Sequence, residues 1–250
     1  MDGLTLSTSG DVVEVALCRG KVNALNETAI EHLRQQLRRV SEDDSIRAVI
    51  LTGRGSFFSF GFDIPELLPY SRGEFARFLT KFTDLCTELF LFPKPVVAAL
   101  NGHAIAGGCM LALGCDQRLM ADAGGKISLN EITFGASVFA GSVEMLVACV
   151  GQRNAAEILY GGAMLSPEKA QALGLVDRVT TQEDLLAESR SAAKQLADSD
   201  QAAFKSIKRL LREPIAERIR ERELASIEEF VDIWYTESTQ RQLREIKIRD

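Results

Sequence analysis

The spacing of apolar and polar residues predicts short strands that alternate with helices over the first half of the chain. Alternating or continuous apolar runs indicate strands, and apolar residues three and four positions apart indicate helices. The predicted strands are 4–8, 12–17, 48–52, 95–100, 117–121 and 126–129, and the predicted helices are 26–41 and 72–92. The first two strands flank a Ser-Gly-Asp turn and are expected to form a hairpin. Asn26 is expected to cap the first helix.

The second half of the chain is mostly helical. Helices are predicted at 140–150, 152–160, 166–173, 182–198, 200–212 and 214–236, with a brief strand at 176–179. Alternating strands and helices that give way to helices alone predict an α/β core with a helical C-terminal part. The apolar stripe of the last helix is expected to pack on this core or on a neighbouring subunit.

A Gly-Gly pair, Gly107 and Gly108, lies between the strand at 95–100 and a short apolar helix predicted at 109–113. Glycine permits positive φ and lets another molecule lie against the backbone. The first N–H groups of a helix have no partner within it, so a bare helix start can hold a negatively charged oxygen. A glycine pair can equally serve helix–sheet packing alone, and spacing does not separate these interpretations.

Candidate chemistry gathers in three segments that follow predicted strands, 57–63, 104–108 and 128–139. Ligands of α/β proteins tend to bind beyond the carboxyl ends of strands. Glu131 is the only acid of the third segment, and apolar neighbours would raise its pKa toward the range of a general base. The alternative is a loop carboxylate that caps a helix or pairs with a lysine. For His103, near the Gly-Gly pair, a bond to nearby backbone is the favoured interpretation.

Composition narrows the function classes. A net charge of −6 disfavours a general nucleic-acid binder or a protein of anionic membrane surfaces. The five cysteines form no Cys-x-x-Cys pair and there are two histidines, so we expect no metal site. Buried free thiols indicate a reducing compartment, and no signal-peptide pattern or membrane-spanning run is recognisable. We therefore expect a cytoplasmic protein.

Six pieces of the chain together resemble the crotonase (enoyl-CoA hydratase/isomerase) superfamily. In chain order they are 21–26, 48–53, 57–64, 95–108, 115–116 and 170–177. The resemblance implies an α/β fold in which a spiral of ββα turns, residues 1–195, forms an acyl-CoA-binding core. It also implies that the helical C-terminal region, residues 196–250, trimerises, so that the protein is a homotrimer or a dimer of trimers.

The ligand implied by the resemblance is an acyl-CoA thioester, with coenzyme A as part of the substrate and no separate cofactor. The thioester oxygen would be held by the N–H groups of Phe62 and Gly107. The residues implied to lie near the CoA moiety are Lys21, Ala24, Leu25, Arg54 and Phe60. Lys205 or Lys208, on a C-terminal helix, would meet its phosphates.

Two glutamates are typical of the enoyl-CoA hydratases, and only one of them is matched here. Met110 occupies the position of the first and Glu131 that of the second. One acid with an apolar partner, and the Leu-Asn-Glu tripeptide that ends at residue 131, resemble the Δ3,Δ2-enoyl-CoA isomerases. The resemblance therefore implies an enzyme that converts 3-enoyl-CoA to 2-enoyl-CoA, with Glu131 as its base.

Two other classes of function stay open at this point. The same glutamate could activate water in an enoyl-CoA hydratase or an acyl-CoA thioester hydrolase. Alternatively, the chain could be a non-catalytic acyl-CoA-binding or assembly protein whose helical surface carries the function. Glu66 and Glu144 are two further acids that could reach the acyl chain.

Overall fold

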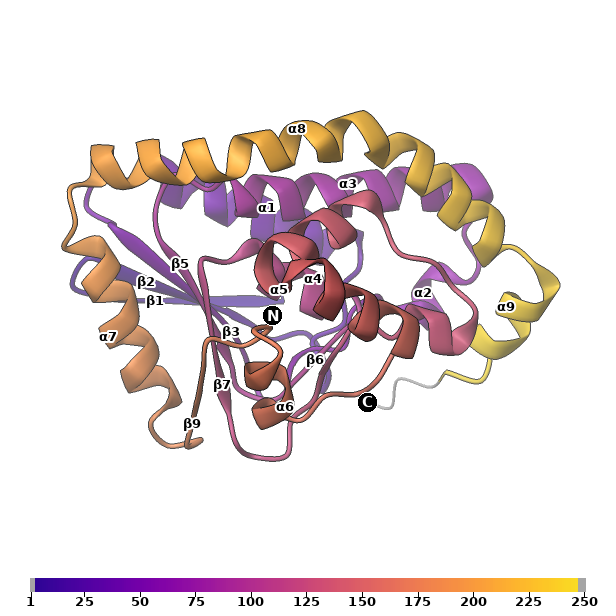
Figure 1. The fold of residues 1–250 in the computed structure, drawn as a ribbon, viewed down its shortest axis with the longest axis horizontal. Helices are drawn as coiled ribbons and strands as arrows, with labels where there is room; N and C mark the ends of the chain where they lie inside the picture. The colour runs from indigo at the N-terminus through magenta and orange to yellow at the C-terminus, as the bar shows by residue number, and fades with distance from the viewer. Residues whose placement is uncertain (1–2, 247–250) are drawn as a thin grey trace.

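Short apolar runs build a six-stranded sheet in the order β1-β2-β3-β5-β7-β9, seen in a computed structural model that describes residues 3–246 (Figure 1). Its strands are β1 (Leu4–Ser9), β2 (Val12–Leu17), β3 (Ala48–Gly53), β5 (Val96–Leu100), β7 (Gln117–Ala121) and β9 (Arg178–Thr180). β1 and β2 form the predicted antiparallel hairpin, and every other neighbouring pair is parallel. Such parallel strands are buried on both faces, which explains their continuous apolar sequences.

A second, three-stranded parallel sheet has the order β4-β6-β8. Its strands are β4 (Phe57–Ser59), β6 (His103–Ile105) and β8 (Ile127–Ser128). Three times in succession the chain adds one strand to the large sheet and the next to the small sheet before a helix follows. This is the predicted spiral of ββα turns. β4 and β6 were not predicted, because both strands have only three residues.

The helices follow the predicted pattern, except that α2 and α9 were not predicted and that two predicted C-terminal helices are joined. They are α1 (Glu27–Glu42), α2 (Ile64–Leu67), α3 (Arg72–Phe90), α4 (Gly107–Gly114), α5 (Ala140–Gly161), α6 (Pro167–Ala172), α7 (Leu185–Ala197), α8 (Gln201–Trp234) and α9 (Glu237–Leu243). Asn26 caps α1, as expected, by accepting the N–H of Ala29. The two helices expected at 200–212 and 214–236 form one, α8, which continues through Pro214. Packing of α8 against α3 and α5 compensates for the backbone hydrogen bond that this proline removes.

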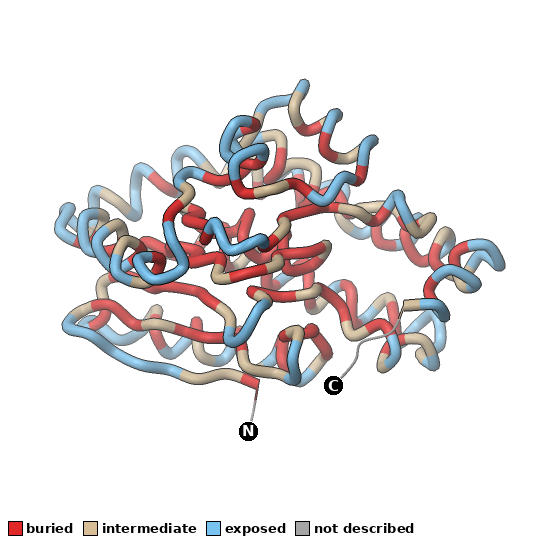
Figure 2. The backbone as a smooth tube through the Cα atoms, turned by 90° about the horizontal axis from the view of Figure 1, so that it is seen from below, coloured by how far each residue is buried: buried red, intermediate tan, exposed pale blue. Residues whose placement is uncertain are grey.

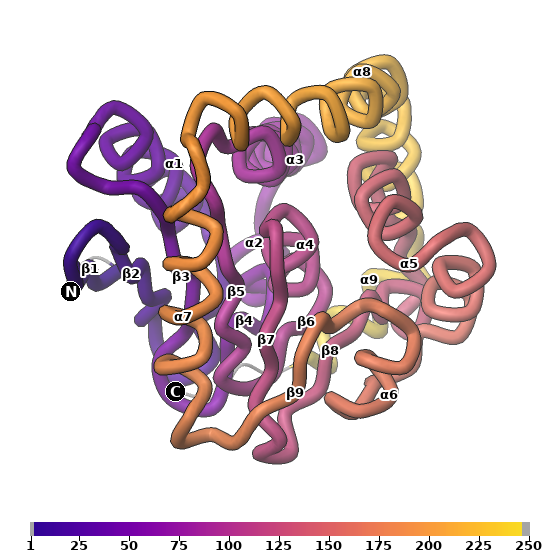
Figure 3. The backbone as a smooth tube through the Cα atoms, turned by 60° about the vertical axis from the view of Figure 1, so that its left-hand side comes forward, coloured from indigo at the N-terminus to yellow at the C-terminus, as the bar shows by residue number. Residues whose placement is uncertain are grey.

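Helices cover the large sheet on both faces. α7 lies across one face, where Leu185, Ala193 and Ala197 pack on the strands (Figure 3). The main core lies on the other side, between the sheet and α1, α3, α4, α5 and α8. Seen from below, the central strands are buried while the outer faces of the helices are exposed (Figure 2). Phe230 and Trp234 of α8 belong to this main core, so the C-terminal helices pack directly on the spiral.

A buried charged cluster fastens the first half of α8 to the core. The Asp116 carboxylate receives Lys208 Nζ at 2.7 Å and Arg212 Nη2 at 3.1 Å. Arg212 also donates to the carbonyls of Gly114 and Cys115 at the end of α4. Burial lowers the pKa of Lys208 to about 8. The expectation that Lys208 meets phosphates was therefore wrong, because its ammonium group is enclosed and paired.

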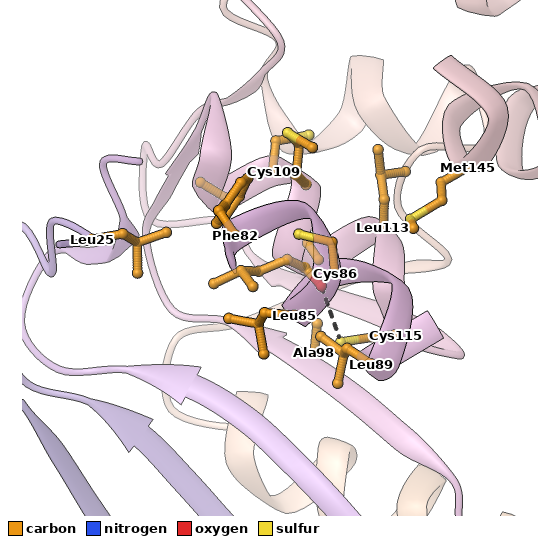
Figure 4. Packing of buried hydrophobic residues seen from close by; sticks show 14 of the residues in the cluster. Leu25, Phe82, Leu85, Cys86, Leu89, Ala98, Cys109, Leu113, Cys115 and Met145 are labelled. Carbon is orange, nitrogen blue, oxygen red and sulfur yellow. Dashed lines mark hydrogen bonds between the residues drawn. The ribbon is translucent and has the colours of Figure 1, made fainter. Parts of the chain in front are cut away.

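The five cysteines are free thiols, as predicted. Cys86, Cys109 and Cys115 lie among leucine and phenylalanine side chains where α3 packs against α4 (Figure 4). Burial raises the pKa of the Cys115 thiol to about 12, so this group stays neutral. Across residues 3–246, no helix combines the length and apolar character needed to cross a membrane.

Candidate active site

The three segments expected to carry chemistry meet around one cavity of about 430 Å³. Strands β4, β6 and β8 run parallel in the small sheet, so the segments that follow them emerge at the same edge. The polar side chains of the lining are few, and the apolar ones come from all three segments and from the C-terminal helices. The lining residues include Phe57, Phe60, Phe62, Ile64, His103, Ile105, Gly107, Met110, Asn130, Glu131, Thr133, Phe134, Phe139, Met164, Phe230, Trp234 and Ile246.

Two backbone turns lie against each other at this cavity. A Cβ placed on Gly61, whose φ is +95°, would be only 3.0 Å from the Gly107 nitrogen. Phe62 follows in the first turn, and Gly107 is the first residue of α4. Within the described chain, neither the Phe62 N–H nor the Gly107 N–H donates to a protein acceptor. Both N–H groups are therefore available as hydrogen-bond donors beside the cavity that Phe62 and Gly107 line.

The glycine pair is required for close packing, and its conformation differs from the expectation. Ala106, with φ 49°, takes the positive φ that we expected at the glycines. A Cβ on Gly108 would lie 2.3 Å from the Ser59 carbonyl oxygen. A Cβ on Gly107 would lie 3.2 Å from ring carbons of Phe62 and Phe82. Helix–sheet packing and an open N–H donor therefore coexist at this turn.

Glu131 begins a 3₁₀ helix, η1 (Glu131–Phe134), and is 6% exposed. Its Oε2 atom is buried without a hydrogen-bond partner. Loss of hydration raises the pKa of this carboxyl to about 7, against an ordinary value of 4.5. No second acid is among the described residues that line the cavity. A lone carboxyl of this kind can exchange protons near neutral pH.

Met110, in the first turn of α4, is the residue that stands where a second acid would be expected in a hydratase. It lines the cavity and is 2% exposed. The buried hydroxyl of Ser142 donates to its sulfur at 3.0 Å. A thioether neither carries a proton nor binds water strongly, so this part of the wall is chemically inert.

The two other candidate acids are held away from the cavity. Glu66 receives hydrogen bonds from Arg19 and Asn26. Glu144 receives Arg218 and Arg222, both near 3 Å. Neither glutamate lines the cavity.

His103 does line the cavity, at its Phe57 side. The planes of the Phe57 and His103 rings are tilted by 38°, and their centroids are 4.8 Å apart. The backbone N–H of Lys126 donates to Nδ1 at 3.2 Å, as the favoured interpretation of this histidine requires. Burial and the charge of Lys126 lower the pKa of the ring. The ring is therefore neutral near pH 7, and we assign it no catalytic role.

Of the five residues expected near CoA, Phe60 lines the cavity and the other four do not. Leu25 is buried beside the turn, where its N–H donates to Gly61 at 2.7 Å. Ala24 is also buried, whereas Lys21 and Arg54 are exposed and do not line the cavity. Lys205 is likewise exposed and outside it.

The C-terminal wall of the cavity was not predicted as part of the site. Phe230 and Trp234 of α8 and Ile246 line it, and the Phe230 and Phe139 rings are 4.5 Å apart. The apolar stripe that places them was visible in the sequence, but a stripe does not say which surface it covers. Across residues 3–246, no group of three metal-binding side chains is present.

The chain is similar to known proteins over most of its length. The sequence profile described as enoyl-CoA hydratase/isomerase matches residues 7–245. The chain is similar to a putative enoyl-CoA hydratase of Thermus thermophilus, with 34% identity over 192 residues that cover 76% of this chain and 75% of the relative. It is also similar to the mitochondrial enoyl-CoA delta isomerase 1 of Mus musculus, with 32% identity over 225 residues, 89% of this chain and 78% of the relative.

A solved structure extends this similarity to the whole fold. The crystal structure of human mitochondrial delta3-delta2-enoyl-CoA isomerase superposes with a TM-score of 0.92 at 28% identity. The match covers 97% of this chain and 95% of the human one. The relatives thus carry both isomerase and hydratase names.

Proposed function

Because the chain belongs to the enoyl-CoA hydratase/isomerase family, we propose that it is the isomerase that converts a 3-enoyl-CoA to the conjugated 2-enoyl-CoA. The observation that carries this proposal is the single buried carboxyl, Glu131, in a cavity whose other acid position holds Met110. Moving a double bond by one position requires one base that can also return a proton. Adding water requires activation of water and protonation of carbon, which two acids accomplish more readily.

The proposed reaction begins with proton transfer to Glu131. Its carboxylate removes a proton from C2, next to the thioester carbonyl, and the electron pair forms a dienolate. The same carboxyl then returns the proton to C4, which leaves the double bond between C2 and C3. No atom is gained or lost. A carboxyl with a pKa of about 7 suits both steps, because neither protonation state is strongly favoured near neutral pH.

The dienolate carries its negative charge on the thioester oxygen, and we propose that Phe62 and Gly107 hold this oxygen. Support comes from their N–H groups, which have no protein acceptor in residues 3–246, and from the contact between their two turns. Removing one donor of such a site in other enzymes costs about 3 kcal/mol of transition-state stabilisation. The apolar wall at Met110, Phe134 and Phe139 would limit the access of water to the intermediate.

The activity can be tested with a small panel of CoA thioesters in water enriched in heavy oxygen. Isomerisation predicts conjugated 2-enoyl-CoA from 3-enoyl-CoA, without incorporation of solvent oxygen. Labelled 3-hydroxyacyl-CoA from 2-enoyl-CoA would identify a hydratase instead. Release of free CoA would identify a hydrolase, and tight binding without turnover would identify a binding protein.

The pH dependence of the isomerase should follow the ionisation of Glu131. The base must be deprotonated, so we expect kcat/KM to be lost as the pH falls through about 7. An ordinary exposed glutamate would give a midpoint near 4.5. Initial rates between pH 5 and pH 9 measure this midpoint, and a value below about 5.5 would contradict the proposed base.

We further propose that the chain acts in the cytoplasm as a homotrimer or a dimer of trimers. Support for association comes from large apolar side chains that are exposed on α8 of the single chain. They are Ile207, Leu210, Leu211 and Leu224.

A further inference from the structure

We infer that Thr239, on the C-terminal helix α9, is a positioning residue for Glu131, which deepens the proposed function and rests on it. Thr239 does not line the cavity. It is 1% exposed, and its hydroxyl donates to the Gly135 carbonyl at 2.6 Å. This contact joins two parts of the chain that are 104 residues apart.

Gly135 is the residue on which the position of η1 depends. It ends the 3₁₀ helix that Glu131 begins, with a left-handed φ of 73°. Its N–H donates to the Ile132 carbonyl at 3.2 Å, and the next N–H, of Ala136, donates to the Glu131 carbonyl at 3.0 Å. These two bonds close the turn that carries Glu131. A displacement of Gly135 would therefore move the carboxyl.

Thr239 is well placed to prevent such a displacement. A Cβ on Gly135 would lie 3.2 Å from the Thr239 hydroxyl oxygen, so the two residues are in direct contact. The Thr239 N–H donates to the Thr236 hydroxyl oxygen at 3.4 Å, which holds Thr239 in the first turn of α9. Thr236 is the N-cap of α9, so the chain of bonds runs from a helix start to the catalytic turn.

The far end of the same loop is held by α8. The N–H of Ala140 donates to Ser226 Oγ at 3.0 Å, and the N–H of Gly141 donates to Glu223 Oε2 at 2.7 Å. No side chain of α5 itself caps this helix start. The loop between Glu131 and α5 is therefore clamped at both ends by the C-terminal helices. A short 3₁₀ helix has few bonds of its own, and these clamps supply the rigidity that proton transfer needs.

The test compares Thr239→Val with Thr239→Ser. Valine keeps the branched shape and removes the hydroxyl, whereas serine keeps the hydroxyl. Hydrogen exchange of the peptide that contains residues 131–139 reports the turn directly, whatever reaction the enzyme catalyses. We expect the amides of Gly135 and Ala136 to exchange about tenfold faster in Thr239→Val, and at the wild-type rate in Thr239→Ser. Wild-type exchange in β5 would show that the fold is intact.

Kinetics then connects the turn to catalysis. We expect kcat for 3-enoyl-CoA to fall about fivefold to tenfold in Thr239→Val while KM changes less than about twofold, with recovery in Thr239→Ser. Arg241→Gln, an exposed change on α9 that removes a surface ion pair with Glu237, is the control and should leave both measurements unchanged. Unchanged exchange in Thr239→Val, or faster exchange with normal kcat, would overturn the inference. Full isomerase activity in Glu131→Gln would instead overturn the proposed function, and the exchange result would still decide whether Thr239 holds the turn.

Discussion

Replacing Glu131 by glutamine is expected to lower kcat for 3-enoyl-CoA by about two to four orders of magnitude. Glutamine has nearly the same shape, but its amide cannot accept the C2 proton or return it to C4. Because the Phe62 and Gly107 donors are untouched, the substrate should still bind, and KM should change little. Steady-state kinetics of the purified variant, with product followed as conjugated thioester, measures both constants.

The matched control is Glu144→Gln. Glu144 is a glutamate near the start of α5, the helix that follows the loop after Glu131. It pairs with Arg218 and Arg222 and does not line the cavity. We expect its kcat to stay within about twofold of wild type, because a partly exposed ion pair contributes little. Equal losses in the two variants would mean that charge or folding, and not the position of the carboxyl, determines the rate.

The second large effect is expected at Gly108, where alanine should destabilise the fold by about 3 kcal/mol and abolish most activity. The added Cβ would lie 2.3 Å from the Ser59 carbonyl oxygen, which is backbone and cannot rotate away. Relief requires α4 to move away from β4. Since α4 carries Gly107 and Met110, that movement would also change the cavity. Urea unfolding gives the free energy, and the same samples give kcat/KM.

Gly161→Ala is the comparison for this variant. Gly161 is the last residue of α5, and a Cβ there meets no atom within 4 Å. Alanine favours helix over glycine, so we expect a gain of up to about 1 kcal/mol and normal activity. A Gly108→Ala protein as stable as wild type would show that the approach between α4 and β4 is looser than the structure indicates.

Much of the architecture could be predicted from sequence because its strands are continuous apolar runs bounded by glycine and proline. The runs that became β3 and β5 are unambiguous in this respect. β4 and β6 were missed because three residues give too little periodicity for an assignment. The break expected before Pro214 is absent because contacts with α3 and α5, which no local pattern reveals, stabilise the continuous helix.

Part of the candidate site could likewise be predicted from the sequence, and part could not. Glu131 stood out as the one acid in an apolar segment, and the structure does place it in the cavity. Phe230, Trp234 and the clamp at Thr239 could not be found, because they are brought to the site by the docking of α8 and α9. For Lys208, in contrast, the sequence suggested a role that the structure contradicts. A lysine on a polar-looking helix was interpreted as a phosphate contact, whereas its partner, Asp116, lies 92 residues earlier in the chain.

The Glu131 carboxyl, which the proposed activity requires, also lowers the thermal stability of the native protein. Its pKa is 4.5 in an unfolded chain and about 7 in the native one, so folding resists ionisation. The native state is penalised as pH rises from about 4.5 to 7, and the full penalty, about 3 kcal/mol, persists above that range. At pH 8 the inactive Glu131→Gln enzyme should therefore melt at a higher temperature than wild type, and the gap should close near pH 4. A library of variants that is selected at pH 8 for thermal stability alone would therefore become enriched in the inactive Glu131→Gln enzyme.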